Sequence, residues 1–513
     1  MTDSERYFPT YGEALAAHAA ERPEQIALRH GERTTDYRTY DRHATQVAHG
    51  LAAMGLTKGD RVGYLGKNSD FAVELALGCA RAGMVFVPII WRLAPAEVAF
   101  ILDDAGAKVL FVEDEFAGAP FAGQRVSMEG EFAEWRDTQP TDPVATEVGP
   151  HDALLQLYTS GTTGLPKGVV LSHHNGTHMR PKLKAAGIYW YSAEPGDSMI
   201  LAMPYGHIAG VGTAMGAVLG GQDLIVHREF DPALLIADVQ RHRVKWMFLV
   251  PAAINLLLAH PDAAKADFSS VRGLTYGASP IPLDLLKQGV ARLRCDFAQL
   301  YGMTETFGTV VSLPPEDHAP GREHVMTSAG KPLPGNEVRI LDADLNPLPP
   351  GATGEVAIRS ESTMLGYWNR PEENAKVMLE GGWFRTGDAG MLDAEGYLYI
   401  QDRIKDMIIT GGENVYPAEV ESAIFGHPAI ADVAVIGVPD ETWGEAVKAV
   451  VVAKPGTELD EAGVIAFARE RIAGFKCPKS VDFIAALPRN PSGKILRREL
   501  RAPFWEGRER QVN

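Results

Sequence analysis

Short apolar runs rich in β-branched residues alternate along the first half of this chain with longer segments suited to helices. The runs are the predicted strands 62–65, 84–90, 109–112, 199–202, 224–226 and 247–250. The predicted helices include 11–20, 71–82, 232–242 and 252–260. Strands that alternate with helices favour buried sheets covered by helices. We therefore expect a layered α/β fold.

The pattern of apolar runs and turn residues changes after residue 350. Between residues 351 and 400, short alternating runs are punctuated by Gly and Asp, which predicts a small β subdomain. The end of the chain then follows the order strand (433–438), strand (446–453), helix (461–473) and strand (481–484), enough for a compact α+β domain. We predict an N-terminal domain over residues 1–402, a hinge at 403–405 and a C-terminal domain over 406–513.

Composition and charge narrow the classes of function. The 513 residues carry 49 Lys and Arg against 66 Asp and Glu, a net charge of −17, which argues against binding to nucleic acid or anionic lipid. Three separated cysteines encode neither a disulfide framework nor a zinc site, so a cytoplasmic location is expected. An uncharged stretch at 198–222 imitates a membrane span, but Pro204 and His207 interrupt it. We expect a loop and a buried helix there, with no integral membrane association.

A loop rich in glycine and hydroxyl side chains, Tyr158-Thr-Ser-Gly-Thr-Thr-Gly-Leu-Pro-Lys-Gly168, directly follows an apolar segment. Its glycines let backbone N–H groups approach phosphate oxygens, its hydroxyls can donate hydrogen bonds, and Lys167 supplies positive charge. Pro166 stands where a Walker A motif would continue with Gly-Lys-Ser/Thr, which disfavours a P-loop NTPase. The predicted phosphate-binding residues are Thr159, Ser160, Gly161, Thr162, Thr163, Gly164 and Lys167.

Four later segments follow this loop in an order typical of one superfamily. They are 299–305 (QLYGMTE), 383–388 (WFRTGD), 402–414 (DRIKDMIITGGEN) and 490–494 (NPSGK). With them the chain resembles the adenylate-forming superfamily of AMP-dependent ligases, which includes acyl-CoA synthetases, peptide-synthetase adenylation domains and beetle luciferases. Its character is closest to CoA ligases for fatty or related carboxylic acids. The resemblance implies a large N-terminal α/β domain with a β subdomain, and a small mobile α+β C-terminal domain.

The resemblance also implies where ATP and Mg²⁺ bind. Tyr301 offers a flat ring to adenine, Asp388 accepts hydrogen bonds from the ribose hydroxyls, and Thr304 donates to the α-phosphate. Glu305 is the implied Mg²⁺ ligand, a hard oxygen donor that shares the ion with the phosphates. The other implied nucleotide-binding residues are Gly277, Ala278, Ser279, Gln299, Gly302 and Arg403.

The implied reaction has two steps. A carboxylate cannot expel oxide, so the acid first attacks the α-phosphorus of ATP, which gives acyl-AMP and pyrophosphate, and a thiol then displaces AMP. Lys494 is the implied catalytic lysine, because its ammonium can bridge the carboxylate and the α-phosphate as charge moves between them. Lys405 occupies the position of the hinge about which the small domain rotates between the steps.

The acyl pocket is predicted from three segments, 205–212, 248–252 and 276–279, which contain no Lys, Arg, Asp or Glu. The lack of a partner for an α-ammonium disfavours amino acids. His207 matches one half of an aromatic–His pair that the family places near the carboxylate, but Gly206 replaces the aromatic ring. We interpret these small residues as a wide or deep pocket, which favours a fatty or other bulky apolar acid over an aryl acid. The predicted pocket residues are Tyr205, Gly206, Gly210, Val250 and Tyr276.

Coenzyme A is the favoured thiol, because no carrier domain follows residue 494. The implied CoA contacts are Gly411, Gly412, Trp443, Phe475 and Lys479. An aryl-CoA ligase, an acyl-AMP ligase that loads a separate carrier protein, and a silent nucleotide-binding protein are the alternatives. The expected partners are the carboxylic acid, ATP and CoA, and the sequence leaves a homodimer open.

Overall fold

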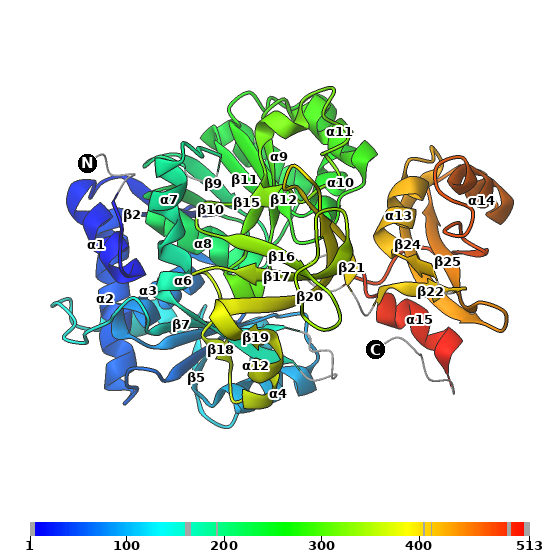
Figure 1. The fold of residues 1–513 in the computed structure, drawn as a ribbon. Helices are drawn as coiled ribbons and strands as arrows, with labels where there is room; N and C mark the ends of the chain where they lie inside the picture. Colours follow the sequence, from blue (N-terminus) through cyan, green and yellow to red (C-terminus); the bar gives the residue numbers. More distant parts are fainter. Residues whose placement is uncertain are drawn as a thin grey trace.

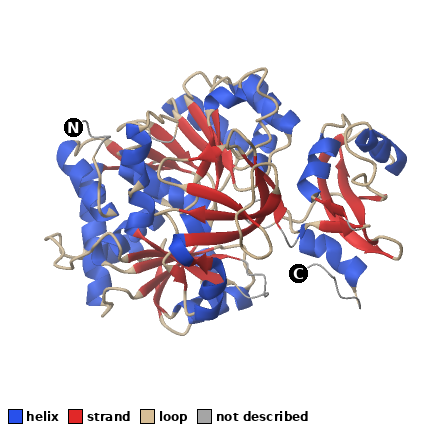
Figure 2. Cartoon of the chain, in the orientation of Figure 1, coloured by secondary structure: helices blue, strands red, loops and turns tan. Residues whose placement is uncertain are grey.

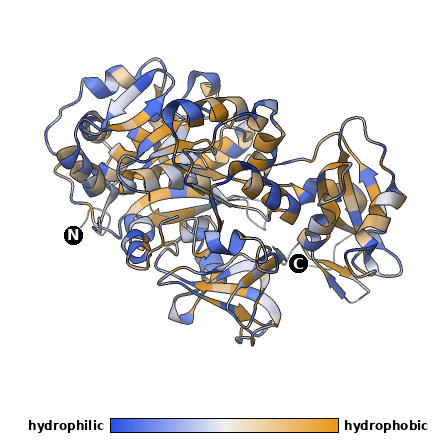
Figure 3. Ribbon diagram, turned by 90° about the horizontal axis from the view of Figure 1, so that it is seen from above, coloured by the Kyte–Doolittle hydropathy of each residue, from blue (hydrophilic) through white to orange (hydrophobic). Residues whose placement is uncertain are grey.

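A computed structural model of the chain describes residues 6–159, 166–190, 193–403, 406–411, 413–489 and 494–506, with the backbone alone at 402 and 403. Figure 1 shows a large body formed by the elements up to β21 and a smaller body formed by β22 to α15. Helices cover the sheets of both bodies (Figure 2). Hydrophobic residues concentrate along the interior strands, and hydrophilic residues dominate the outer loops (Figure 3).

The first large sheet has seven strands in the order β18-β8-β7-β4-β3-β5-β6. Strands β3 to β7 all run parallel to one another, whereas β8 pairs antiparallel with both β7 and β18. The strands are β3 (Arg61–Leu65), β4 (Val85–Ile89), β5 (Ala107–Val112), β6 (Gln124–Ser127), β7 (Ala153–Thr159), β8 (Lys167–Ser172) and β18 (Gly366–Tyr367). The helices that accompany this sheet are α2 (Tyr37–Ala53), α3 (Asp70–Ala82), α4 (Pro95–Ala105) and α5 (Phe132–Asp137).

The second large sheet has nine strands in the order β15-β14-β13-β12-β11-β9-β10-β1-β2. They are β1 (Ile26–His30), β2 (Arg33–Asp36), β9 (Ser198–Leu201), β10 (Asp223–Val226), β11 (Trp246–Leu249), β12 (Gly273–Gly277), β13 (Asp296–Tyr301), β14 (Val311–Leu313) and β15 (Lys331–Pro332). The helices are α1 (Tyr11–Glu21), α6 (His173–Thr177), α7 (Met179–Ala185), α8 (Ile208–Gly220), α9 (Pro232–His242), α10 (Pro251–Ala259) and α11 (Leu283–Leu293). One buried core of α1, α2, α3 and α8 joins the two large sheets, and a second core places α9, α10 and α11 on the nine-stranded sheet.

An antiparallel sheet follows in the large body, as the punctuated texture of 351–400 predicted. Its path is β16-β17-β20-β19, with β21 paired to β20. The elements are β16 (Glu337–Leu341), β17 (Thr353–Arg359), α12 (Pro371–Val377), β19 (Met378–Leu379), β20 (Trp383–Leu392) and β21 (Leu398–Arg403).

The small body contains a five-stranded sheet with helices on both of its faces. Its strands are β22 (Ile408–Thr410), β23 (Glu413–Val415), β24 (Ile430–Asp440), β25 (Gly444–Ala453) and β26 (Ser480–Phe483), and its helices are α13 (Pro417–Phe425), α14 (Glu461–Arg469) and α15 (Arg497–Trp505). Helices α13 and α14 pack on one core of this sheet, and α15 packs on another. The α/β fold class, with a β subdomain and a C-terminal α+β domain, is confirmed.

The stretch at 198–222 folds as β9, a loop and helix α8, as its interruptions by Pro204 and His207 predicted. In the described part of the chain, no helix is both long enough and apolar enough to cross a membrane. The helix predicted over 461–473 ends earlier than expected, at Arg469, where Glu470 caps it.

Candidate active site between the two bodies

A cavity of about 660 Å³ lies between the two bodies. From the large body its wall includes residues at and beyond the carboxyl ends of β12 and β13, and residues of β20 and β21. From the small body it includes one face of α13 together with Lys494 and Arg497. Because β12 and β13 are parallel neighbours, their carboxyl ends meet at the same edge of the sheet. Of the residues predicted for nucleotide binding and catalysis, Ala278, Ser279, Gln299, Tyr301, Gly302, Asp388 and Lys494 line this cavity.

Tyr301 and Asp388 come from different sheets and meet in the cavity wall. The Tyr301 hydroxyl donates a hydrogen bond of 2.8 Å to Oδ2 of Asp388. Asp388 is 6% exposed, so its carboxylate is largely shielded from solvent. An aromatic face and an oriented carboxylate therefore lie side by side, which suits a purine and the hydroxyls of its sugar.

The turn after β12 is backbone-strained. Ala278 has φ +68°, a left-handed conformation that costs a residue with a Cβ roughly 1–2 kcal/mol. Such strain is concentrated at functional sites. The preceding residue, Gly277, packs closely against the neighbouring strand. A Cβ there would lie 2.2 Å from the carbonyl oxygen of Leu300 on β13, so strand packing and not the approach of a ligand requires glycine at this position.

Glu305 lies in a single helical turn, Thr304–Thr306, directly after the cavity residues Gly302 and Met303. Its side chain turns inward and is held from β18, because the Tyr367 hydroxyl donates a hydrogen bond of 2.9 Å to Oε1 of Glu305. The backbone N–H of Met364 also donates to the carbonyl oxygen of Glu305, at 2.8 Å. The sequence analysis missed Tyr367, and its only local signal is a Gly-Tyr pair in a segment whose pairing with β8 is non-local.

The phosphate loop is delivered by a hairpin, because Thr159 at the end of β7 pairs with Lys167 at the start of β8. Ser160, Gly161, Thr162, Thr163 and Gly164 lie outside the described residues. The Lys167 ammonium forms an ion pair with Glu373 of α12 and lies 5.1 Å from the centre of the Tyr367 ring. This ion pair, with one from Lys376, lowers the pKa of Glu373 to about 2. Glu373 is a second residue that the sequence analysis missed.

The hinge region is described in part. The backbone of Arg403 pairs with Asp388 across β21 and β20, which places residue 403 beside the cavity edge. The side chain of Arg403, and Lys405 and Gly412 as a whole, lie outside what the structure describes.

His207 directly precedes α8 and is half-buried, with its Nε2 atom shielded from solvent. Burial, with a smaller contribution from the charge of Arg92, lowers the pKa of His207 to about 4. Its Nε2 atom has no hydrogen-bond partner among the described residues. The imidazole is therefore neutral near pH 7 and keeps one ring nitrogen available for a ligand.

The two glycines around His207 do not widen a pocket, contrary to the sequence interpretation. A Cβ at Gly206 would lie 2.9 Å from the backbone N and Cα of Ile90, and a Cβ at Gly210 would lie 2.2 Å from the carbonyl oxygen of Pro204. Backbone occupies the space that a side chain would need. The missing aromatic ring therefore leaves close packing rather than an enlarged cavity.

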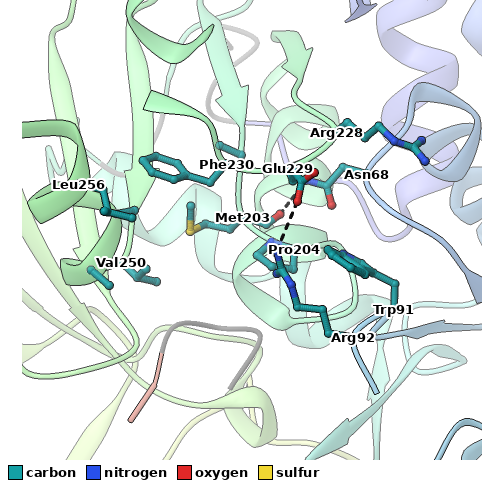
Figure 4. A pocket seen from close by; sticks show the side chains of 13 residues that line it. Asn68, Trp91, Arg92, Met203, Pro204, Arg228, Glu229, Phe230, Val250 and Leu256 are labelled. Atoms are coloured by element: carbon teal, nitrogen blue, oxygen red, sulfur yellow. Dashed lines mark hydrogen bonds and ion pairs between the residues drawn. The ribbon is translucent and has the colours of Figure 1, made fainter. Parts of the chain in front are cut away.

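A second cavity, of about 230 Å³, lies in the large body beside β9 and α10 (Figure 4). Phe230, Val250 and Leu256 form an apolar side, and Trp91, Arg92 and Glu229 lie opposite. Arg92 pairs with Glu229 at 3.4 Å and lies 4.0 Å from the centre of the Trp91 ring. Segments distant from 205–212, 248–252 and 276–279 thus supply the charges that those segments lack.

Of the predicted acyl-pocket residues, Val250 lines this second cavity, whereas the two tyrosines lie in the core. Tyr205 packs with its ring centre 5.9 Å from that of Phe86. The hydroxyl of Tyr276 is 3.0 Å from Nε2 of His318. The sequence around Tyr205 and Tyr276 could not show this burial, because Phe86 and His318, which pack against them, are distant in sequence.

The residues predicted to contact CoA separate into two groups. Trp443 covers Gly411, whose N–H donates to the Trp443 carbonyl at 2.8 Å and whose Cβ, if present, would lie 2.7 Å from the indole. Phe475 and Lys479 are exposed. Between them in the chain, Lys476 lines the large cavity and pairs with Glu419 of α13 at 2.7 Å.

The chain is similar to known proteins over most of its length. Residues 15–368 match the AMP-binding enzyme family, and residues 419–494 match the AMP-binding enzyme C-terminal domain. A fatty acid–[acyl-carrier-protein] ligase, ScoC, of Streptomyces coeruleorubidus is 42% identical over 98% of both chains. A feruloyl-CoA synthase of an Amycolatopsis species is 40% identical over 94% of this chain and 96% of its own. The crystal structure of ATP-bound MatB from Rhodopseudomonas palustris superposes with a TM-score of 0.88 at 30% identity, over 96% of this chain and 99% of that one.

Proposed function

Because this chain belongs to the AMP-binding enzyme family of adenylate-forming acid–thiol ligases, we propose that it activates an apolar carboxylic acid with ATP and transfers the acyl group to coenzyme A. The single observation that carries this proposal is the shared cavity, which is lined by Lys494 of the small body and by the Tyr301–Asp388 pair of the large body. The first step needs a positive charge near the phosphates and a surface that binds the nucleoside. Lys494 of the small body supplies the charge, and Tyr301 and Asp388 of the large body supply the surface.

In the first step, a carboxylate oxygen attacks the α-phosphorus of ATP, the bond to the β-phosphate oxygen breaks, and pyrophosphate leaves. Adenine lies against Tyr301, and the ribose hydroxyls donate to Asp388, whose orientation the Tyr301 hydroxyl fixes. Thr304 donates to the α-phosphate. Lys494 stabilises the negative charge that moves from the carboxylate to the phosphate oxygens, a preorganised electrostatic contribution.

Glu305 fits the role of a Mg²⁺ ligand, because its carboxylate is a hard oxygen donor, 9% exposed, and oriented by the Tyr367 hydroxyl. The ion, when bound with the nucleotide, supplies positive charge that neutralises the phosphates. Lys167 contributes at the base of the phosphate loop, where its pairing with Glu373 holds the ammonium in place.

In the second step, a thiolate attacks the acyl carbon of acyl-AMP, and AMP leaves with the bonding electrons. We propose that the C-terminal domain, bounded by a hinge at 403–405, turns so that Lys494 withdraws and Gly411 approaches the acyl group. Trp443 above Gly411 then forms one wall of the thiol path. A carrier protein in place of CoA is the second candidate, and it is favoured by the acyl-carrier-protein ligase among the relatives.

For the acid, we propose that the alkyl or aryl portion extends toward the cavity beside Val250. Its apolar side suits hydrocarbon. The neutral His207 near the start of α8 adds no charge that would repel or bind a second ionic group. Fatty acids and aryl acids such as ferulate, the acid named for the feruloyl-CoA synthase, are both candidates, because the widened pocket that favoured a fatty acid is not formed at Gly206 and Gly210.

The proposal is tested by pyrophosphate release with purified enzyme, ATP, Mg²⁺ and one acid at a time: octanoate, dodecanoate, ferulate or leucine. We expect release with at least one of the first three and none with leucine. Mass spectrometry of parallel reactions with CoA or with a holo-acyl carrier protein identifies the thiol. If the thioester forms on the carrier protein alone, the carrier protein and not CoA is the acceptor. If the protein binds nucleotide but releases no pyrophosphate with any acid, it is a silent nucleotide-binding protein.

Val250→Phe tests the acyl assignment. The added ring reduces the second cavity, so we expect the KM for dodecanoate to rise while that for octanoate changes less. Equal changes for the two acids would place the hydrocarbon elsewhere.

A further inference from the structure

The segment that carries Lys494 is anchored to helix α13. Three residues after Lys494, the guanidinium of Arg497 makes a bidentate pair with Glu421, with distances of 2.8 and 2.7 Å from Nη2 to Oε1 and Oε2. The side chains of Arg497 and Glu421 are only 11% and 14% exposed. Forked, shielded pairs of this kind hold a fixed geometry, unlike a pair of flexible surface charges.

Two faces of helix α13 pack against different surroundings. Val420 and Ile424 are buried in the core of the small body. Ala418, Glu419, Ser422 and Ala423 line the interdomain cavity. The spacing of these positions follows the helical period, so one face of α13 serves its own domain and the adjacent face serves the active site.

The C-terminal end of α13 docks on the large body. Phe425, the last residue of the helix, packs against the core of the small body and also against the core of β11, α10 and α11 in the large body. At the next position, a Cβ on Gly426 would lie 2.3 Å from Oδ2 of Asp284 in the first turn of α11. In Figure 1, α13 lies on the side of the small body that faces the large one. The two domains thus approach closely at this end of the helix.

We propose that α13 positions Lys494 for the adenylation step, with Phe425 as the docking residue and the Glu421–Arg497 pair as the link to the lysine. The chain of contacts runs from α11 through Phe425 along one turn of helix to Glu421, then through Arg497 to the segment of Lys494. This inference rests on the proposed function and adds positioning residues that act through Lys494.

The competing explanation is that Phe425 and Glu421 only stabilise the small body. The two explanations differ in the half-reactions they affect. Loss of stability lowers both steps together. Loss of docking lowers acyl-AMP formation, which needs Lys494 in the cavity, and spares transfer from acyl-AMP, which needs a different arrangement of the small body.

The decisive variant is Phe425→Ala. We expect pyrophosphate release to slow about tenfold or more in kcat, with the KM for ATP changed less than twofold, because the nucleotide wall belongs to the large body. Transfer from supplied acyl-AMP to CoA should stay within about twofold of the wild type, with the acyl-AMP made from the most active acid of the panel. Phe483→Ala is the matched control, because Phe483 is an exposed phenylalanine of the same domain, 43% exposed on β26.

Phe425→Leu and Glu421→Gln keep the test decisive if the alanine variant does not fold. Leucine retains an apolar dock and should restore most of the adenylation rate. Glutamine removes the charge that the Arg497 fork binds and should lower adenylation selectively, as Phe425→Ala does. Equal losses in both half-reactions, or no loss in either, would overturn the positioning role. If the wild type itself releases no pyrophosphate with any acid, the proposed function is overturned and the positioning role falls with it, whereas an active wild type with unselective variants overturns the positioning role alone.

Discussion

The two walls of the interdomain cavity are held in different ways. On the large body, Tyr301 and Asp388 belong to strands of two sheets and hydrogen-bond to each other, and Glu305 is held by Tyr367. These contacts lie within one body. On the small body, the segment of Lys494 is tied to α13 by the ion pair of Arg497 with Glu421, and α13 meets the large body through Phe425.

This difference separates binding from catalysis. The contacts of the large-body wall join residues of that body alone, so under the proposed function this wall would hold the adenosine portion through both half-reactions. The small-body wall meets the large body through Phe425, so under the proposed domain rotation Lys494 would serve the first half-reaction and then withdraw. Substitutions on the two walls should therefore have different kinetic signatures.

Lys494→Ala should have the largest effect. Loss of the ammonium should slow adenylation by at least about 10²-fold, some 3 kcal/mol of transition-state stabilisation. Transfer of supplied acyl-AMP to CoA should be retained. Pyrophosphate release and thioester formation measure the two steps separately, with Lys454→Ala as the control at an exposed lysine of the same domain. Equal losses in both steps would remove the distinction between the walls.

Asp388→Asn should impair both half-reactions, because the nucleotide wall is common to them. Loss of a charge-assisted acceptor is worth about 1.5–3 kcal/mol, so we expect a rise of roughly 10- to 100-fold in the KM for ATP and a weaker use of supplied acyl-AMP. Asp344→Asn, at an exposed turn, is the control. An effect on adenylation alone would contradict a shared adenosine site.

Tyr367→Phe should have a smaller effect, confined to the Mg²⁺ requirement. The variant keeps the ring beside Lys167 and removes only the hydroxyl that orients Glu305. Because the variant loses a hydrogen bond to a charged group, we expect the Mg²⁺ concentration for half-maximal adenylation to rise about fivefold. Titration with Mg²⁺ measures it, and Tyr189→Phe, an exposed tyrosine, is the control. An unchanged Mg²⁺ titration would show that Glu305 needs no such orientation.

Mild acid should distinguish the two bodies by stability. Burial lowers the pKa of His173, His178, His207 and His318 in the large body to about 4, whereas the small body contains one histidine, His427. Between pH 6.5 and 4 the unfolded histidines bind protons that the folded ones do not, so the stability of the large body falls as pH falls.

Thermal unfolding by calorimetry at pH 7.5 and 5.5 measures this difference, and we expect the melting temperature of the large body to drop by about a few degrees and that of the small body to change less. His318→Gln should reduce the dependence of the large body's stability on pH. Glutamine fills much of the space of the imidazole beside Tyr276, so the packing there should be kept. Equal acid sensitivity in both bodies would show that the buried histidines do not control it.

The strands and helices of the large body were predictable because each buries its own apolar run. Val62–Leu65 and Met199–Leu201, for example, lie in β3 and β9. The β subdomain and the α+β domain were predictable for the same reason. The acyl pocket was not, because Gly206 accommodates the backbone of Ile90, a residue distant in sequence that lies close only in the folded chain.

Local sequence established the family, the order of the elements and the residue types that suit ATP, since motifs and periodic burial are properties of short segments. Contacts between distant segments decided the rest: Tyr367 on Glu305, Glu373 on Lys167, and α13 between Lys494 and α11. Each of these joins residues whose proximity depends on how sheets and domains pack. Short sequence motifs therefore identify the residue types that carry the chemistry of the site, whereas long-range packing sets their positions.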